Sequence, residues 1–176
     1  MQPWIQTYTG QIFTPFDPQP EQIEIKDIAH ALSQIARYNG HSHDLISVAE
    51  HSIVMAENVS HRAAIHALLH DAAEAYIGDF AKPIKDYFPE FERIEYRIMQ
   101  VIYHALGICP PSSDIITEIK EADCRMLLTE RNQFMDTPPK PWDVDGHFEP
   151  YGVTMPRYDS EQAETVFLAT YEKLRV

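Results

Sequence analysis

Hydrophobic residues recur at helical spacing along most of the chain and predict a protein built mainly from α-helices. The first such series indicates an amphipathic helix of about three turns and consists of Ile25, Ile28, Ala29, Leu32, Ile35 and Ala36. Ser47 followed by Glu50 is a capping box, which predicts a helix from Ser47 to about Asn58. The expected helices span residues 25–36, 47–58, 60–77, a short turn near Pro83, 89–106, 114–135 and 159–175.

A short β-hairpin is expected before the first helix. Ile5 and Thr7 form one β-prone run and Ile12 with Phe13 forms another, and Thr9–Gly10 between them suits a tight turn. We therefore predict an all-α bundle of six or seven helices with a possible N-terminal hairpin. With no internal repeat to divide it, the chain is expected to form a single domain over residues 1–176.

Residues 136–158 interrupt the helical pattern. Their prolines exclude a regular helix, and their aromatic side chains would be costly to leave in water. The residues concerned are Pro138, Pro139, Pro141, Pro150 and Pro156 with Trp142, Phe148, Tyr151 and Tyr158. We expect an ordered loop that lies on a surface of the protein or across a subunit contact. It would join a helical core at 24–135 to a C-terminal helix at 159–175.

Charge and cysteine usage narrow the function classes. The net charge of the 176 residues is −13, which argues against a nucleic-acid polymer as a partner because phosphate backbones need clustered Lys and Arg. Cys109 and Cys124 form no CxxC pair, so a disulfide framework is not expected. No signal peptide or apolar run of about 18 residues is visible. We expect a cytoplasmic protein with no membrane partner.

Four polar residues stand where the surrounding pattern predicts burial. They are His51, His70, Asp71 and Asp123, and they belong to three different predicted helices. A His-Asp dipeptide alone is more often a core histidine bonded to the neighbouring aspartate. Two histidines and two aspartates so placed would each need a separate partner, whereas one metal ion would satisfy all of them.

The stretch IHALLHDAAEAYIGDF at Ile65–Phe80 supplies further carboxylates. Glu74 lies one helical turn after His70, and Asp79 follows the helix break expected at Gly78. A solvated helix carboxylate and a turn residue are the alternatives for Glu74 and Asp79. A zinc site built on the HxxxH pair that begins at His66 is disfavoured, because it would leave both aspartates unexplained.

With these residues in view, the chain resembles the HD superfamily of metal-dependent phosphohydrolases. The similar stretches are SVAEHS around His51, LLHDAAEAYIGDFAKPIK around His70–Asp71 and EADCRMLL around Asp123, in this order over roughly residues 25–131. Within the superfamily, the chain is most similar to bacterial HD-type 5′-deoxynucleotidases and cyanophage dATP triphosphohydrolases. The resemblance implies an HD-domain helical bundle whose metal ligands are the two histidines and the two aspartates.

This donor set favours a divalent transition metal. Two imidazoles and two carboxylates suit Zn, Co, Mn, Fe or Ni better than Mg, which prefers oxygen ligands. Such an ion lowers the pKa of water and neutralises charge on phosphoryl oxygens. By the resemblance, Glu74 and Asp79 would lie beside the ion as catalytic groups, orienting water, protonating the leaving oxygen or holding a second ion such as Mg.

The resemblance also indicates substrate-binding residues. In the family, an arginine and an aromatic residue precede the first metal histidine, as Arg37 and Tyr38 do here, although tryptophan is the familiar aromatic. Arg37 would form a fork on a phosphate, and His41 is a candidate phosphate or base contact. Lys82 and Lys120 are candidates for further phosphates, with exposed salt-bridge lysines as the alternative. Taken alone, Arg37 would instead be interpreted as a solvated residue of a surface turn.

Three functions are consistent with these residues. The first is a triphosphohydrolase that converts a deoxynucleoside triphosphate, such as dATP, to deoxynucleoside and tripolyphosphate. The second is a 5′-deoxynucleotidase that releases orthophosphate from monophosphates. The third, from another class, is a non-catalytic interaction module stapled by a metal. The expected partners are a small nucleotide and further copies of the chain, in a dimer or hexamer.

Overall fold

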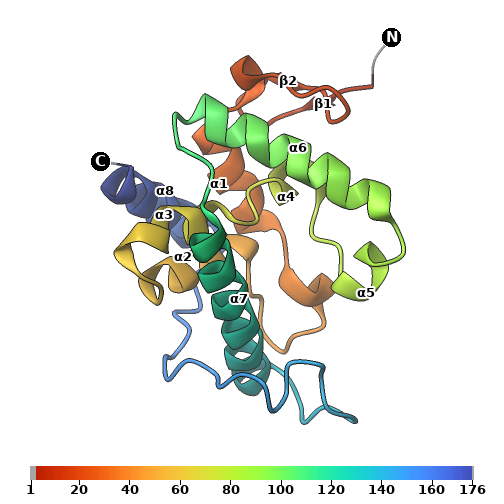
Figure 1. The fold of residues 1–176 in the computed structure, drawn as a ribbon, viewed down its shortest axis with the longest axis vertical. Helices are drawn as coiled ribbons and strands as arrows, with labels where there is room; N and C mark the ends of the chain where they lie inside the picture. Colours follow the sequence, from red (N-terminus) through yellow and green to blue (C-terminus); the bar gives the residue numbers. More distant parts are fainter. Residues whose placement is uncertain (1–2, 176) are drawn as a thin grey trace.

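The computed structural model describes residues 3–175, and most of that part of the chain is helical (Figure 1). Its α-helices are α1 (Ile25–Gln34), α2 (Val48–Glu57), α3 (His61–Leu69), α4 (Glu74–Ile77), α5 (Lys82–Lys85), α6 (Pro89–Ala105), α7 (Ser113–Phe134) and α8 (Ser160–Leu174). Two short 3-10 turns, η1 (Pro20–Gln22) and η2 (Arg37–Gly40), flank α1. Among the described residues, α4 and α5 are single turns and the other helices are longer. The expected all-α fold is confirmed.

The N-terminal hairpin is also confirmed. Its strands, β1 (Ile5–Gln6) and β2 (Ile12–Phe13), pair antiparallel. Gly10 in the turn has a φ of +87°, a left-handed conformation that glycine adopts at little steric cost. The Phe13 side chain is fully buried and stacks on the ring of Tyr76, with 3.9 Å between the ring centroids. This ring contact joins the hairpin to α4.

α2 is the central helix of the bundle. Every residue from 48 to 56 is buried, and α1, α3, α7 and α8 all pack against α2. At its N-cap, the Ser47 hydroxyl accepts a hydrogen bond from the Glu50 amide at 3.1 Å, as the predicted capping box requires. The Glu50 carboxylate does not complete the box, because it accepts from the Arg157 amide at 2.7 Å. The cap fixes the first turn of the helix that carries His51.

We expect Ser47→Ala to lower the free energy of unfolding by about 1 kcal/mol, because the Glu50 amide loses its acceptor at a buried helix end. Urea unfolding followed by circular dichroism measures the change. Ser112→Ala is the control, since Ser112 stands at the N-cap of α7 without a side-chain capping bond. Equal losses in the two variants would contradict a capping role for Ser47.

The helix expected around the His-Asp dipeptide is interrupted, so the prediction of one continuous helix is wrong. α3 ends at Leu69, and residues 70–73 form tight turns before α4 begins at Glu74. The Glu74 amide donates to the Asp71 carbonyl at 2.9 Å, three residues earlier, as in a 3-10 turn. The dipeptide therefore sits at a helix end, where the chain is wound more tightly than in an α-helix.

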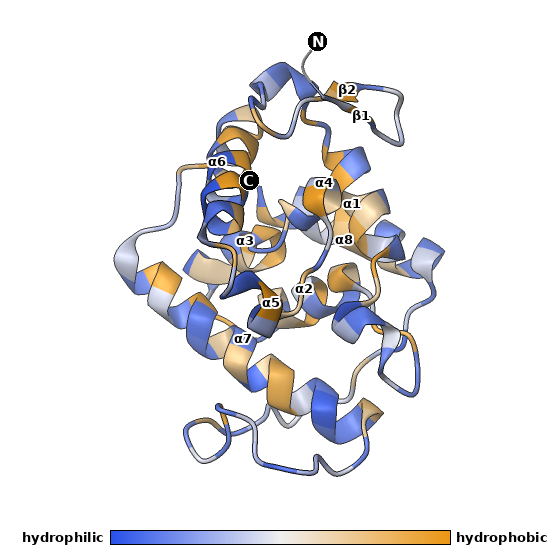
Figure 2. Ribbon diagram, turned by 90° about the vertical axis from the view of Figure 1, so that its right-hand side faces the viewer, coloured by the Kyte–Doolittle hydropathy of each residue, from blue (hydrophilic) through white to orange (hydrophobic). Residues whose placement is uncertain are grey.

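Hydrophobic faces of the outer helices close the core. In Figure 2, hydrophobic and hydrophilic residues alternate along α6 and α7, as expected for helices with one buried face. The buried residues of α6 are Ile98, Met99, Ile102 and Tyr103. Among residues 3–175, every helix is too short or too polar to cross a membrane.

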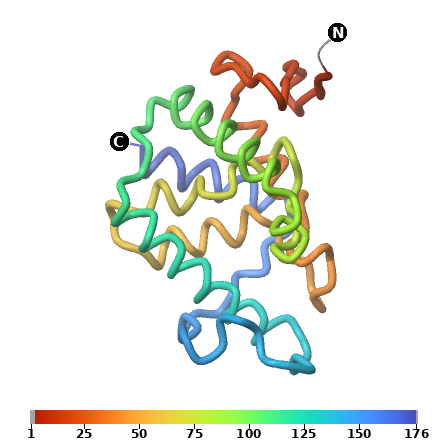
Figure 3. The backbone as a smooth tube through the Cα atoms, turned by 45° about the vertical axis from the view of Figure 1, so that its right-hand side comes forward, coloured from red at the N-terminus to blue at the C-terminus, as the bar shows by residue number. Residues whose placement is uncertain are grey.

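The proline-rich loop at 136–158 lies against the C-terminal half of α7, at the end of the molecule opposite the hairpin (Figures 1 and 3). Side chains of α7 bind its backbone. Arg125 donates to the Glu149 carbonyl at 3.0 Å, and Thr129 accepts from the Tyr151 amide at 2.8 Å. The loop is therefore ordered on a surface of its own chain, which is one of the two placements expected from the sequence.

Candidate metal centre

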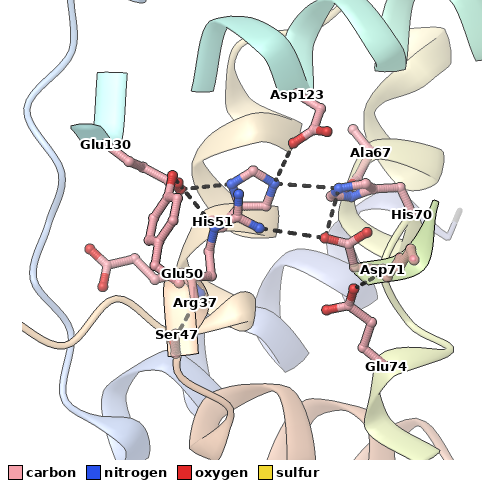
Figure 4. A network of polar contacts seen from close by, with 12 residues as sticks. Arg37, Ser47, Glu50, His51, Ala67, His70, Asp71, Glu74, Asp123 and Glu130 are labelled. Atoms are coloured by element: carbon pink, nitrogen blue, oxygen red, sulfur yellow. Dashed lines mark hydrogen bonds and ion pairs between the residues drawn. The ribbon is translucent and has the colours of Figure 1, made fainter. Parts of the chain in front are cut away.

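Three of the predicted metal ligands converge between α2 and the end of α3. One ligand atom each of His51, His70 and Asp71 lies within 4.8 Å of the other two. The two Nε2 atoms are 3.4 Å apart, and His70 Nε2 is 3.0 Å from an Asp71 carboxylate oxygen (Figure 4). His51 is fully buried, while the other two are partly exposed. These residues could hold a metal ion.

The fourth predicted ligand, Asp123, lies beside this group on α7. Its Oδ1 is 3.3 Å from His51 Nε2, and its side chain is 48% exposed. Figure 4 shows the carboxylate directed at the end of the His51 ring that also faces His70. The compact group consists of the other three residues, so the role of Asp123 as a ligand stays a prediction.

The hydrogen bonds of the imidazoles show what the group can bind. His51 Nδ1 lies 2.7 Å from a Glu130 carboxylate oxygen, and His70 Nδ1 lies 2.8 Å from the Ala67 carbonyl. Because both partners are acceptors, each Nδ1 carries a proton, and each Nε2 would offer a lone pair to a metal ion once it has lost its own proton. The two Nε2 atoms face one another with the Asp71 carboxylate beside them. A positive charge between these atoms, such as a metal ion, would stabilise this arrangement.

The pKa values reflect the same electrostatics. Burial alone would lower the pKa of His70, but the neighbouring Asp71 and Asp123 carboxylates raise it to about 9. Burial alone would raise the pKa of Asp71, but the imidazoles of His70 and His51 and the Arg37 guanidinium hold it well below its usual range. The group thus has a strong affinity for a positive charge.

Glu130 is a residue of the site that the sequence interpretation missed. It lies on α7, two helical turns after Asp123, and it is fully buried. Its Oε2 accepts hydrogen bonds from Arg37 Nε at 3.0 Å and from the Tyr38 hydroxyl at 2.5 Å, while its Oε1 faces His51. The spacing from Asp123 was the available signal, since a carboxylate at that position continues the same helix face.

Arg37 is buried, so its interpretation as a solvated surface residue is wrong. Its amide donates to the Ile46 carbonyl at 2.9 Å, which ties η2 to the chain that enters α2. The next residues, Tyr38 and Asn39, have positive φ values of 56° and 52°, a conformation that costs free energy in residues other than glycine. One guanidinium nitrogen lies 3.7 Å from Asp71. Arg37 and Tyr38 therefore adjoin the metal group, as predicted for substrate-binding residues.

Glu74 and Asp79 adjoin the same site. Burial raises the pKa of Glu74 to about 9, with Asp71 and Asp79 adding to the effect and Lys85 opposing it. Burial also raises the pKa of Asp79. Lys85, which the sequence interpretation missed, donates to Glu74 at 3.1 Å and to Glu95 at 3.0 Å. An ion pair between α4, α5 and α6 thus fixes the Glu74 side chain.

Comparison with known proteins identifies relatives that are similar to this chain in sequence. No protein-family model matches it. The chain is 39% identical over 128 residues to a protein of Escherichia coli (strain K12) named uncharacterized protein YfdR, and the match covers 73% of this chain and 70% of the relative. The chain belongs to the YfdR family. It is also 40% identical over 91 residues to uncharacterized protein RCAP_rcc00048 of Rhodobacter capsulatus, a match that covers 47% of this chain and 46% of that relative.

In this member of the YfdR family, the remaining candidates lie outside the metal group. His41, Lys82 and Lys120 are exposed, and Lys82 pairs with Asp86 at 3.6 Å. The roles of these three residues stay predictions. His66 is buried on α3 with its ring edge-on to a tyrosine of α6, and it is not part of the group that could hold a metal. The HxxxH arrangement thus gains no support.

Proposed function

We propose that this protein is a metal-dependent phosphohydrolase of the HD superfamily that acts on deoxynucleotides. Its substrate would be a deoxynucleoside triphosphate, with a purine such as dATP preferred, and its products a deoxynucleoside and tripolyphosphate. The observation that carries the proposal is the convergence of His51, His70 and Asp71 within 4.8 Å, with the two Nε2 atoms facing one another. This is the arrangement expected from the resemblance of the surrounding stretches to HD phosphohydrolases.

The donor set fits a divalent transition metal such as Zn, Co, Mn, Fe or Ni. His51, His70 and Asp71 would hold the ion, and Asp123 would complete the set from α7. When bound, the ion supplies Lewis-acid charge and lowers the pKa of water toward neutrality. Oxygen donors are the ligands Mg prefers, so Glu74 and Asp79 are the residues we assign to an optional second ion.

The neighbouring residues supply the remaining chemistry. The Nε–H of Arg37 donates to Glu130, and one terminal nitrogen lies on the side of Asp71. The terminal nitrogens would therefore donate to a phosphate oxygen. Tyr38 and His41 would contact the sugar and base. Without a second ion, Glu74 and Asp79 would divide the acid and base roles, one protonating the leaving oxygen and the other orienting the attacking water.

Two further lysines, Lys82 and Lys120, favour a triphosphate over a monophosphate as the substrate. Lys82 is the first residue of α5 and is exposed. Lys120 is on α7, one turn before Asp123. A triphosphate has more negative charge than Arg37 can offset alone, and these lysines would bind it. The second candidate is the 5′-deoxynucleotidase, which needs only Arg37.

The cellular compartment and the oligomeric state are part of the proposal. We propose a cytoplasmic enzyme, because Cys109 and Cys124 are free thiols, and we propose that it assembles as a dimer or hexamer. Size-exclusion chromatography with light scattering measures the assembly.

A non-catalytic interaction module remains the distant alternative; it leaves Glu74, Arg37 and Lys85 without a use, since a structural metal site needs no acid or base groups.

Incubation of the metal-loaded protein with dATP and with dAMP, followed by ion-exchange chromatography, tests the proposal. We expect deoxyadenosine and tripolyphosphate from dATP, and no reaction after chelation until a divalent metal is added back. Orthophosphate from dAMP alone would instead favour the 5′-deoxynucleotidase. If neither nucleotide reacts with any of Mn, Co, Ni or Zn, the catalytic proposal is wrong and the interaction module takes its place.

A further inference from the structure

One carboxylate joins the two halves of the candidate site. Glu130 touches His51 of the metal group through Oε1, and Arg37 and Tyr38 of the candidate substrate site through Oε2, at distances of 2.5–3.0 Å. These partners come from α2 and η2, whereas Glu130 comes from α7. In Figure 4 the Glu130 carboxylate lies on the opposite side of the His51 ring from His70.

The chemistry of these contacts requires an ionised carboxylate. All three partners offer hydrogens to it: the His51 Nδ1–H, the Arg37 Nε–H and the Tyr38 hydroxyl. A glutamine of the same shape has one acceptor oxygen and one NH₂ group, and the NH₂ group would face a donor. Glu130 is fully buried, and the Arg37 charge balances its own. The network is therefore specific for glutamate in both shape and charge.

We infer that Glu130 is a positioning residue that sets both halves of the site at once. Its bond to His51 fixes the tautomer with the proton on Nδ1 and directs the Nε2 lone pair toward His70 and Asp71. Its bonds to Arg37 and Tyr38 hold the guanidinium and the aromatic ring next to the metal group. The part that concerns nucleotide binding rests on the proposed function, whereas the part that concerns metal binding does not.

This inference predicts that one substitution alters two measurable affinities. Glu130→Gln should weaken Co²⁺ binding by about 10- to 100-fold, because the ligand His51 loses the bond that orients it. At saturating Co²⁺, the KM for dATP should rise by about tenfold with a smaller change in kcat, because Arg37 loses a charge-assisted hydrogen bond. A visible-absorbance titration with Co²⁺ alone measures the first effect, and steady-state kinetics measure the second.

A conservative variant separates positioning from folding. Glu130→Asp keeps the negative charge that balances Arg37 but withdraws the carboxylate by one methylene group, so we expect it to fold and to show the same two defects. Glu121→Gln is the matched control, because Glu121 is an exposed glutamate of the same helix. We expect that control to leave Co²⁺ affinity and KM within about twofold of the unsubstituted protein. Circular dichroism establishes that each variant is folded.

The tautomer of His51 in the unsubstituted, metal-free protein is an independent measurement. Nitrogen-15 NMR of the imidazoles should show Nδ1 protonated in His51, and this tautomer preference should be lost in the Glu130 variants. A folded Glu130→Asp protein with unchanged Co²⁺ affinity, or a His51 ring protonated on Nε2 alone, would overturn the inference. Failure of the unsubstituted protein to hydrolyse nucleotides would overturn the proposed function and leave the metal and tautomer results to decide the role of Glu130.

Discussion

His70→Ala and Asp71→Ala should each remove the bound metal and lower the hydrolysis rate by at least about 1000-fold. Each change deletes one of the three ligand atoms that lie within 4.8 Å of one another. The remaining ligands cannot compensate, since His51 is held by Glu130 and cannot move to take a second position. Metal content after desalting, measured by plasma mass spectrometry, should fall to the level of a chelated sample.

A buried histidine of α3, the helix that ends just before His70, provides the control for these variants. His66→Gln replaces the residue one turn before His70, which lies outside the metal group. It should retain the metal and the activity. Loss of metal from His66→Gln together with its retention by Asp71→Ala would contradict the His-Asp site and restore the HxxxH alternative.

Glu74→Ala should keep the metal and lose about 100-fold or more of the rate, the range expected for a group that transfers or orients a proton. Glu74 is not one of the residues that hold the ion in our proposal, yet its carboxylate is buried next to them. The variant should therefore bind Co²⁺ as the unsubstituted protein does. Single-turnover kinetics at saturating metal measure the loss in the chemical step.

Loss of an ion pair must be distinguished from loss of a catalytic group. Glu95→Gln provides this control, because Glu95 and Glu74 bind the same Lys85 ammonium and Glu95 lies on α6. We expect Glu95→Gln to stay within about threefold of the full rate. A normal rate for Glu74→Ala, or equal losses in both variants, would remove Glu74 from the catalytic mechanism.

Much of the helical architecture was predictable because it depends on local patterns. The cap at Ser47, the proline that opens α6 and the apolar spacing of α7 and α8 each act over one or two helical turns. The convergence of His51 and His70 was predicted on other grounds, from polar residues in apolar surroundings that one metal ion would satisfy and from the resemblance to HD phosphohydrolases. The helix ends and the apolar spacing require no knowledge of distant parts of the chain.

Features that depend on distant contacts were not predictable in this way. Arg37 follows a surface-like polar pattern, yet Glu130 from far along the chain makes its burial favourable. Glu130 itself stands in the stretch LLTERN, which has the ordinary composition of an exposed helix end. The tight turns at residues 70–73 were missed because a helix and a 3-10 turn share nearly the same sequence preferences.

Hydrogen bonds between α7 and the proline-rich loop recur at matched intervals along both segments. Arg125, Thr129 and Gln133 are four residues apart on one face of the helix, where four residues advance the chain by about 6 Å. In the loop, the bonded carbonyls and amides belong to Glu149, Tyr151, Val153 and Met155. Two residues of extended chain advance by about 6.6 Å, so the two repeats stay in register over this distance.

These four bonds use backbone groups of the loop, whereas the Asp145 carboxylate and the Tyr151 ring contact Arg131 and Arg125 of α7 through their side chains. The bonds require an amide hydrogen at residues 151 and 155. Two of the prolines, Pro150 and Pro156, stand immediately beside those positions. Substitutions elsewhere in the segment can accumulate, whereas the insertion or deletion of a single residue would put every later contact out of step. The length of the chain between residues 149 and 155 is thus constrained more strictly than most of its side chains.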